Sequence, residues 1–83
     1  MYSFELSKNA KNFLKKIPRQ DYEVILKKIY SLNENPFRFL KRLKGSKLWR
    51  LRVLKYRAVV DVVVSGHRIV VLRIRYRKNV YEK

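Results

Sequence analysis

The chain lacks several of the residue types on which enzyme active sites commonly depend. It has no cysteine, which excludes disulfides and thiolate chemistry. His67 is the only histidine and the six acidic residues are scattered, so neither a metal site nor a pair of catalytic histidines is expected. Gly45 and Gly66 are the only glycines, so there is no glycine-rich phosphate loop. We therefore expect no cofactor, and any catalysis must use arginine, lysine and tyrosine.

Long apolar runs are also missing, although apolar residues are abundant. No run approaches the roughly 20 residues of a membrane span, and residues 1–5 lack a signal-peptide pattern, so we expect a cytoplasmic protein without membrane contact. The composition is 47% hydrophobic and includes six Tyr, four Phe and Trp49, which is enough to form a core. Residues 1–83 are accordingly predicted to form one small domain.

Acidic residues are few, and the chain is very basic as a result. Its formal net charge is +16, and such a surface attracts polyanions, with nucleic acid as the default partner. Residues 1–36 carry +3 and residues 37–83 carry +13, with nine of the ten arginines in the second segment. The guanidinium group of arginine can donate hydrogen bonds to two phosphate oxygens at once. A basic surface that served only solubility would instead mix both signs of charge.

The first half of the chain is predicted to be one short strand and two helices. Residues 2–6 alternate apolar and polar side chains, which indicates a strand, and Ser7 follows as a helix N-cap. An apolar helical stripe continues to Pro18, which ends the first helix. A second amphipathic helix is predicted from about Arg19 to Asn33. The two helices are expected to lie as a hairpin on a flat surface.

The second half is predicted to be rich in strands. Leu48–Leu54 alternates, and Tyr56–Val64 is dense in valine. A hairpin turn at residues 65–66 leads to a long last strand, Arg68–Arg77, in which Val70, Leu72 and Ile74 share one face. A short extra strand near Leu40–Leu43 is a further option. The fold class is α+β, in the order β–α–α–β–β–β, with both helices on one face of a twisted, mainly antiparallel sheet and an open, cationic second face.

Alternation along the strands places arginines on that open face. They are Arg50 and Arg52 from one strand, Arg57 from the next, and Arg73, Arg75 and Arg77 from the last, with Tyr76 and Tyr81 nearby. Arginines interleaved with aromatic rings suit single-stranded RNA, whereas a solvated face would more often mix Thr, Ser, Lys and Glu. RNA can be cleaved without a metal, because its 2′-hydroxyl attacks the adjacent phosphate and arginines stabilise the charge that develops.

A set of short motifs runs along almost the whole chain. They are Asn35-Pro36, Leu43-Lys44-Gly45, Trp49-Arg50-Leu51-Arg52-Val53, Tyr56-Arg57 and Arg77-Lys78-Asn79-Val80-Tyr81. Each motif is weak alone, but in this order, after one strand and two helices, they resemble the RelE/ParE superfamily of toxins. The resemblance implies a RelE-like toxin domain with a fold akin to that of small microbial ribonucleases.

The resemblance also implies a function and partners. RelE-like toxins enter the ribosomal A site and cleave mRNA there, and an antitoxin wraps the toxin and blocks it. The expected protein is thus the toxin of a type II toxin–antitoxin system, a metal-independent mRNA interferase that inhibits translation. Its expected partners are the ribosome with its mRNA and rRNA, and an acidic RelB-like antitoxin in a heterodimer or heterotetramer. The charge of +16 independently favours an acidic partner.

Residue roles follow from the same resemblance by position. Arg50 and Arg52 match basic residues that contact and activate the scissile region. Arg57 and Arg77 match phosphate-stabilising arginines, and Tyr81 matches a tyrosine that stacks on or orients the substrate base. The further basic residues expected to bind RNA are Lys44, Lys47, Arg73, Arg75 and Lys78.

One departure from the RelE pattern leaves alternatives open. Well-studied RelE toxins carry lysines at the positions of Arg50 and Arg52, and arginine is a poor general base because it stays protonated. Either Tyr81 or a lysine such as Lys47 takes that role, or charge stabilisation dominates. The alternatives are a ParE-like inhibitor of DNA gyrase, which shares the fold, and a non-enzymatic RNA-binding protein. The retained Arg57 and the terminal motif favour the RelE branch.

Overall fold

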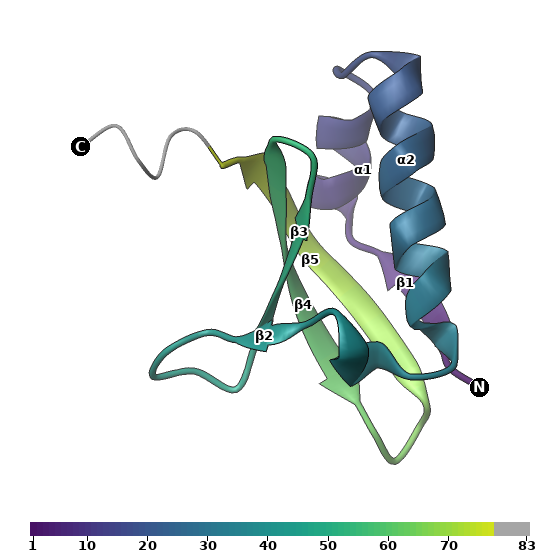
Figure 1. The fold of residues 1–83 in the computed structure, drawn as a ribbon, viewed down its shortest axis with the longest axis vertical. Coiled ribbons are helices and arrows are strands. Elements are labelled where there is room, and N and C mark those ends of the chain that lie inside the picture. Colours follow the sequence, from purple (N-terminus) through teal and green to yellow (C-terminus); the bar gives the residue numbers. More distant parts are fainter. Residues whose placement is uncertain (78–83) are drawn as a thin grey trace.

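The computed structural model describes residues 1–77 and shows two helices on one face of a five-strand sheet (Figure 1). The helices are α1 (Lys8–Leu14) and α2 (Arg19–Tyr30), followed by 3₁₀ turns at Ser31–Asn33 and Pro36–Arg38. The strands are β1 (Ser3–Leu6), β2 (Lys41–Arg42), β3 (Trp49–Val53), β4 (Tyr56–Val63) and β5 (Arg68–Tyr76). Their order is β1-β5-β4-β3-β2, with β1 parallel to β5 and the other pairs antiparallel. The predicted α+β fold is confirmed, including the optional strand.

Helix α1 begins as predicted but ends early. The Ser7 hydroxyl oxygen accepts the N–H of Ala10 at 3.0 Å, and the same hydroxyl donates to the Leu72 carbonyl of β5 at 2.7 Å. The helix ends at Leu14, although Pro18 was the predicted limit. Pro18 disfavours helical backbone angles at the residue before it, Ile17. The chain accordingly turns over residues 15–17 before α2 begins. The second helix was predicted to extend to Asn33, but α2 ends at Tyr30 and Ser31–Asn33 form a 3₁₀ turn.

Strand β5 contains one extra residue relative to its neighbour β4. Val59 of β4 pairs with Arg73, but the next residue, Val60, pairs with Val71. Leu72 therefore has no partner on β4, which is the definition of a β-bulge. A bulge of this kind changes which side chains face the core from that point onward.

The bulge corrects the predicted apolar face of the last strand, which was Val70, Leu72 and Ile74. The buried residues of β5 are instead Ile69, Val71 and Ile74. Two of the three predicted positions were wrong because uninterrupted alternation was assumed across the bulge.

The core between the two layers is centred on Tyr56, which is 1% exposed. Its hydroxyl donates a hydrogen bond of 2.5 Å to the carboxylate of Asp21 in the first turn of α2. The ring lies 5.9 Å from the ring of Phe13 in α1 and 5.2 Å from that of Tyr76 in β5, between centroids. Burial raises the pKa of the Tyr56 hydroxyl well above its ordinary value, and the bond to Asp21 raises it further. One side chain thus joins both helices to the sheet.

We predict that Tyr56→Phe lowers the free energy of unfolding by about 1–2 kcal/mol at neutral pH, because Asp21 loses a hydrogen-bond donor. The difference from the unsubstituted protein should shrink above about pH 10. Because the pKa of Tyr56 is higher in the folded than in the unfolded chain, its contribution is fully present below the unfolded value of about 10 and falls as the pH rises.

Urea unfolding of both proteins at about pH 7 and about pH 11 measures this contribution. Tyr30→Phe is the matched control, because the Tyr30 ring is 64% exposed. A Tyr56→Phe protein that is no less stable than the Tyr30→Phe protein at neutral pH would contradict the prediction.

Candidate nucleic-acid interface

The sheet face that the helices leave open carries two rows of basic residues. Residues paired directly across neighbouring strands project from the same face. One row runs from Arg52 through Arg57 to Arg75. The second row runs from Arg50 through Val59 to Arg73 and is extended on β2 by Lys41, which pairs with Arg50. The register therefore places five of the predicted arginines together on this face.

A hollow of about 270 Å³ lies on the open face over β4 and β5. Its lining residues are Leu43, Arg57, Val59, Arg73 and Arg75. We call this site the arginine hollow. Arg57 is half-buried within it, whereas Arg73 and Arg75 are exposed. Three of the arginines predicted to lie on the open face thus line the same hollow.

Arg50 and Arg52 share the open face but do not line the arginine hollow. They line a second, smaller hollow of about 150 Å³ with Lys28, Phe39 and Lys41. The Nε of Arg50 is buried and has no hydrogen-bond partner among residues 1–77. The sequence predicted one continuous arginine site, whereas the structure divides its lining between two hollows that share no lining residue, and the second of them also includes Lys28 of α2.

The arginines that line the two hollows are not neutralised by carboxylates within the described chain. The ion pairs among residues 1–77 are Arg19–Glu23 and Arg68–Glu5, and neither involves a residue of the two hollows. Asp61 of β4 and Glu5 of β1 both pair with Val70 of β5, so these two acidic residues lie on the same face, but neither lines a hollow. An uncompensated group of guanidinium ions attracts phosphate and supplies several donors to it.

Arg77 has a contact that sequence reasoning missed. Its Nη1 donates to the Leu54 carbonyl at 2.9 Å, and its backbone N–H donates to the Lys55 carbonyl at 2.7 Å. These carbonyls belong to the two-residue turn between β3 and β4. Leu54 has φ 54°, a left-handed conformation that is strained for a residue with a side chain. Arg77 therefore holds this turn, whatever further role it has toward phosphate, and no residue pattern signalled the strain.

The remaining predicted site residues are basic groups around the face. Lys44 and Lys47 are exposed in the loop between β2 and β3, next to the Leu43 wall of the arginine hollow. Gly45 gives this loop a turn with φ 72°. Lys78 and Tyr81 lie outside the described residues, so their placement beside the arginines stays a prediction.

Several solved structures with a similar fold are toxins, alone or with their antitoxins. The chain matches the Mycobacterium tuberculosis toxin–antitoxin complex RelBE2 with TM-score 0.81 and 22% identity, covering 92% of this chain and 98% of that one. It matches the archaeal RelE–RelB complex of Pyrococcus horikoshii OT3 with TM-score 0.82 and 23% identity, covering 92% and 94%. It matches the YoeB/ParE toxin of Agrobacterium tumefaciens with TM-score 0.75 and 24% identity, covering 92% and 98%. The fold is therefore that of the RelE-like toxins.

The family follows from the sequence itself. A family model described as the ParE toxin of the type II toxin–antitoxin system parDE matches residues 4–81. The chain therefore belongs to this family, within the RelE/ParE superfamily, and is a toxin of a type II toxin–antitoxin system. None of the curated proteins with which it was compared matches it. Neither helix in the described part of the chain is long and apolar enough to cross a membrane.

We predict that Leu54→Gly raises the free energy of unfolding by about 0.5–1 kcal/mol. Glycine adopts positive φ without steric cost, and this relief exceeds the added flexibility of the unfolded chain. Lys55→Gly is the matched control, because Lys55 adjoins Leu54 in the same turn but does not have positive φ. This substitution should therefore destabilise the protein, since it only adds flexibility to the unfolded chain. Thermal unfolding of both variants measures the difference. Equal destabilisation by both substitutions would show that the turn is unstrained.

Proposed function

We propose that this toxin is a metal-independent endoribonuclease that cleaves mRNA in the ribosomal A site and thereby inhibits translation. The observation that carries the proposal is the arginine hollow, in which Arg57, Arg73 and Arg75 converge. A phosphodiester is the anion that such a group of planar guanidinium ions fits best. RNA also brings its own nucleophile, the 2′-hydroxyl, so the protein needs neither a metal nor a nucleophilic side chain.

The chemistry that these residues support is electrostatic. As the 2′-oxygen attacks, negative charge gathers on the phosphoryl oxygens, and donors that are already in position stabilise it without reorganisation. Arg57 is the best placed, because it lies on the middle strand between its paired neighbours Arg52 and Arg75. Proton transfer requires a different group, since arginine stays protonated. Lys47 and Tyr81 remain the candidates for that role.

The proposal includes two kinds of partner. The M. tuberculosis and P. horikoshii structures are complexes of a toxin with its antitoxin, and an acidic RelB-like antitoxin in a heterodimer or heterotetramer suits a chain of net charge +16. The second partner is the ribosome with its mRNA and rRNA, which places the toxin in the cytoplasm. Lys44 and Lys47, exposed beside the arginine hollow, are proposed to contact RNA backbone, together with Lys78.

We predict that Arg57→Ala lowers the rate of mRNA cleavage about 100-fold, because one transition-state charge contact contributes on the order of 3 kcal/mol. Purified protein is added to ribosomes programmed with a defined mRNA, and primer extension maps the new 5′ ends to the A-site codon. Arg68→Ala is the matched control: it removes the same charge from an exposed site at the start of β5, paired with Glu5, and should cleave normally. Thermal unfolding of both variants shows whether either has lost its fold. Equal rates for the two folded variants would remove Arg57 from the proposed site.

A second candidate function is inhibition of DNA gyrase, which the match to the ParE family model favours. It predicts intact A-site mRNA and a loss of supercoiling when gyrase, relaxed plasmid and the toxin are combined. Supercoiling that proceeds normally, together with cut mRNA, supports the endoribonuclease. RNA that is retained but never cut, with supercoiling unaffected, would point to an RNA-binding protein without catalysis.

A further inference from the structure

Two phenylalanine rings are exposed at the edge of the sheet that β2 forms. Phe37 is 43% exposed and Phe39 is 36% exposed, although the next residue, Leu40, is buried and anchors this segment in the core. Because β1 and β2 are the two outer strands, this edge lies across the sheet from the N-terminal strand (Figure 1). The surface that we call the aromatic edge consists of Phe37, Arg38, Phe39, Lys41, Arg42 and Trp49.

Neighbouring residues hold the aromatic edge in position. The ring of Phe37 packs on the indole of Trp49, with 5.0 Å between the ring centroids. The guanidinium group of Arg42 lies 4.6 Å from the centroid of the same indole, and its Nε donates to the Ser46 carbonyl at 3.2 Å. The three side chains are therefore already stacked before any ligand arrives, which lowers the entropy cost of binding one.

The aromatic edge carries cations that no carboxylate within the described chain neutralises. Residues 35–60 contain nine lysines or arginines and no acidic residue. Neither of the two ion pairs among residues 1–77 involves a residue of the aromatic edge. Lys28 of α2 adds a further cation, with its Nζ 3.9 Å from the centroid of the Phe39 ring. Exposed rings among cations suit single-stranded nucleic acid, because bases stack on the rings and phosphates meet the cations.

The aromatic edge is continuous with the second hollow, the one that contains Arg50. Strand β2 has only two residues, and they project to opposite faces of the sheet. Lys41 lines the second hollow together with Phe39, whereas Arg42 pairs with Trp49 on the other face. An RNA chain that leaves the second hollow around β2 therefore meets the stacked residues next.

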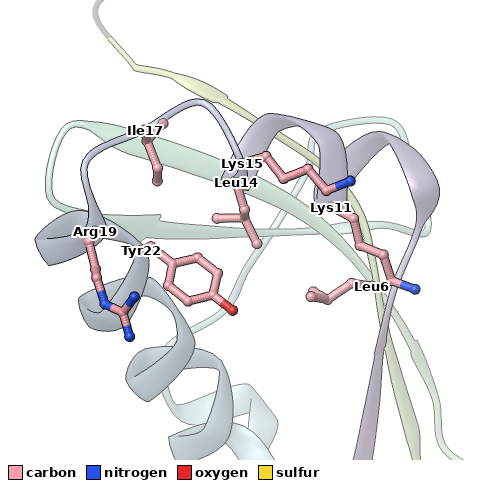
Figure 2. A pocket seen from close by; sticks show the side chains of 7 residues that line it. All are labelled: Leu6, Lys11, Leu14, Lys15, Ile17, Arg19 and Tyr22. Atoms are coloured by element: carbon pink, nitrogen blue, oxygen red, sulfur yellow. The ribbon is translucent and has the colours of Figure 1, made fainter.

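The groove between α1 and the start of α2 does not offer the same chemistry. Its floor is mostly aliphatic, with Leu6, Leu14 and Ile17, and Tyr22 is the one aromatic residue among those that line it (Figure 2). This groove also shares no lining residue with either hollow. An RNA chain held by the arginines is therefore expected to continue along the aromatic edge and not across the helices.

We propose that the aromatic edge binds unpaired bases of the RNA chain whose phosphates occupy the two hollows. The proposal rests on the proposed function in taking RNA as the ligand, but it does not require cleavage. A base stacks on the exposed ring of Phe37, and Arg42 donates to the phosphate beside it. Purines bind more tightly than pyrimidines, because the strength of stacking sets the preference at such surfaces.

The test uses RNA oligomers of about eight nucleotides whose 2′-oxygens are methylated, so that the protein cannot cut them. An adenine-rich oligomer is compared, at about 0.15 M ionic strength, with an abasic oligomer that has the same phosphates but no bases. Trp49 is the only tryptophan in the chain and packs on Phe37 and Arg42, so its fluorescence reports on the aromatic edge.

The adenine-rich oligomer is expected to bind at least about tenfold more tightly than the abasic one and to change the fluorescence of Trp49. Equal affinities, no binding of either oligomer, or binding that leaves this fluorescence unchanged would overturn the proposal.

Exposed rings at the two edges of the sheet give a matched pair of variants. Phe37→Leu keeps an apolar side chain on Trp49 but removes the stacking ring, so it should weaken the adenine-rich oligomer about fivefold or more and the abasic one less than about twofold. Tyr30→Leu removes an exposed ring that packs on Phe4 of β1, at the other edge, and should weaken neither oligomer. Equal losses in the two variants would refute the role of Phe37. Unfolding curves confirm that each variant is folded.

Salt dependence separates the phosphate contact from the base contact. Arg42→Gln removes one charge, so the slope of log affinity against log salt concentration should become shallower by about 0.7. Phe37→Leu should leave the slope unchanged, and so should the control Arg19→Gln, which removes an exposed charge at the start of α2. The same slope in the Arg42→Gln and Arg19→Gln proteins would refute the phosphate contact of Arg42.

The two proposals can fail separately. Base-dependent binding without cleavage of mRNA on the ribosome would refute the endoribonuclease and leave the aromatic edge standing. Cleavage of mRNA together with equal affinities for the adenine-rich and abasic oligomers would refute the aromatic edge alone.

Discussion

The pairing of β4 with β3 on one side and β5 on the other determines most of this molecule. It decides at once which residues enter the core and which remain on the open face. Leu51 and Ala58 pair on the buried side, while Arg52 and Arg57 pair on the other. Because side chains alternate along a strand, a shift of one residue would put arginines into the core and valines into water. The cost of burying those guanidinium groups is what fixes the register.

Much of the fold and part of the site could be predicted from the sequence, because period-two and helical patterns are local. The strands and the faces of Arg50, Arg52 and Arg57 follow from alternation, and the helices follow from apolar residues at helical spacing. The bulge at Leu72 could not be predicted, because it depends on how β5 fits beside β4 and where the Ser7 hydroxyl meets it. The same holds for the left-handed Leu54, which no turn signature marks.

The site differed from expectation for a related reason. Alternation assigns a residue to a face but does not say how far along a twisted sheet its side chain reaches. Arg50 and Arg52 accordingly share the face of Arg57 but line a different hollow, and Arg77 reaches the turn between β3 and β4. The hydrogen bond from Tyr56 to Asp21 joins residues that are remote in sequence, and no local pattern links them.

The parallel pair of β1 and β5 has a consequence for the order of events in the cell. Residues 3–6 form their partner contacts with residues 68–71, so β1 has no place in the sheet until residues 68–71 have been synthesised. Contacts between such distant segments carry a large loop-closure cost and form late. A nascent or truncated toxin therefore lacks the finished sheet that supports its arginines, and a ribosome that is still making this protein does not yet carry a folded copy of it.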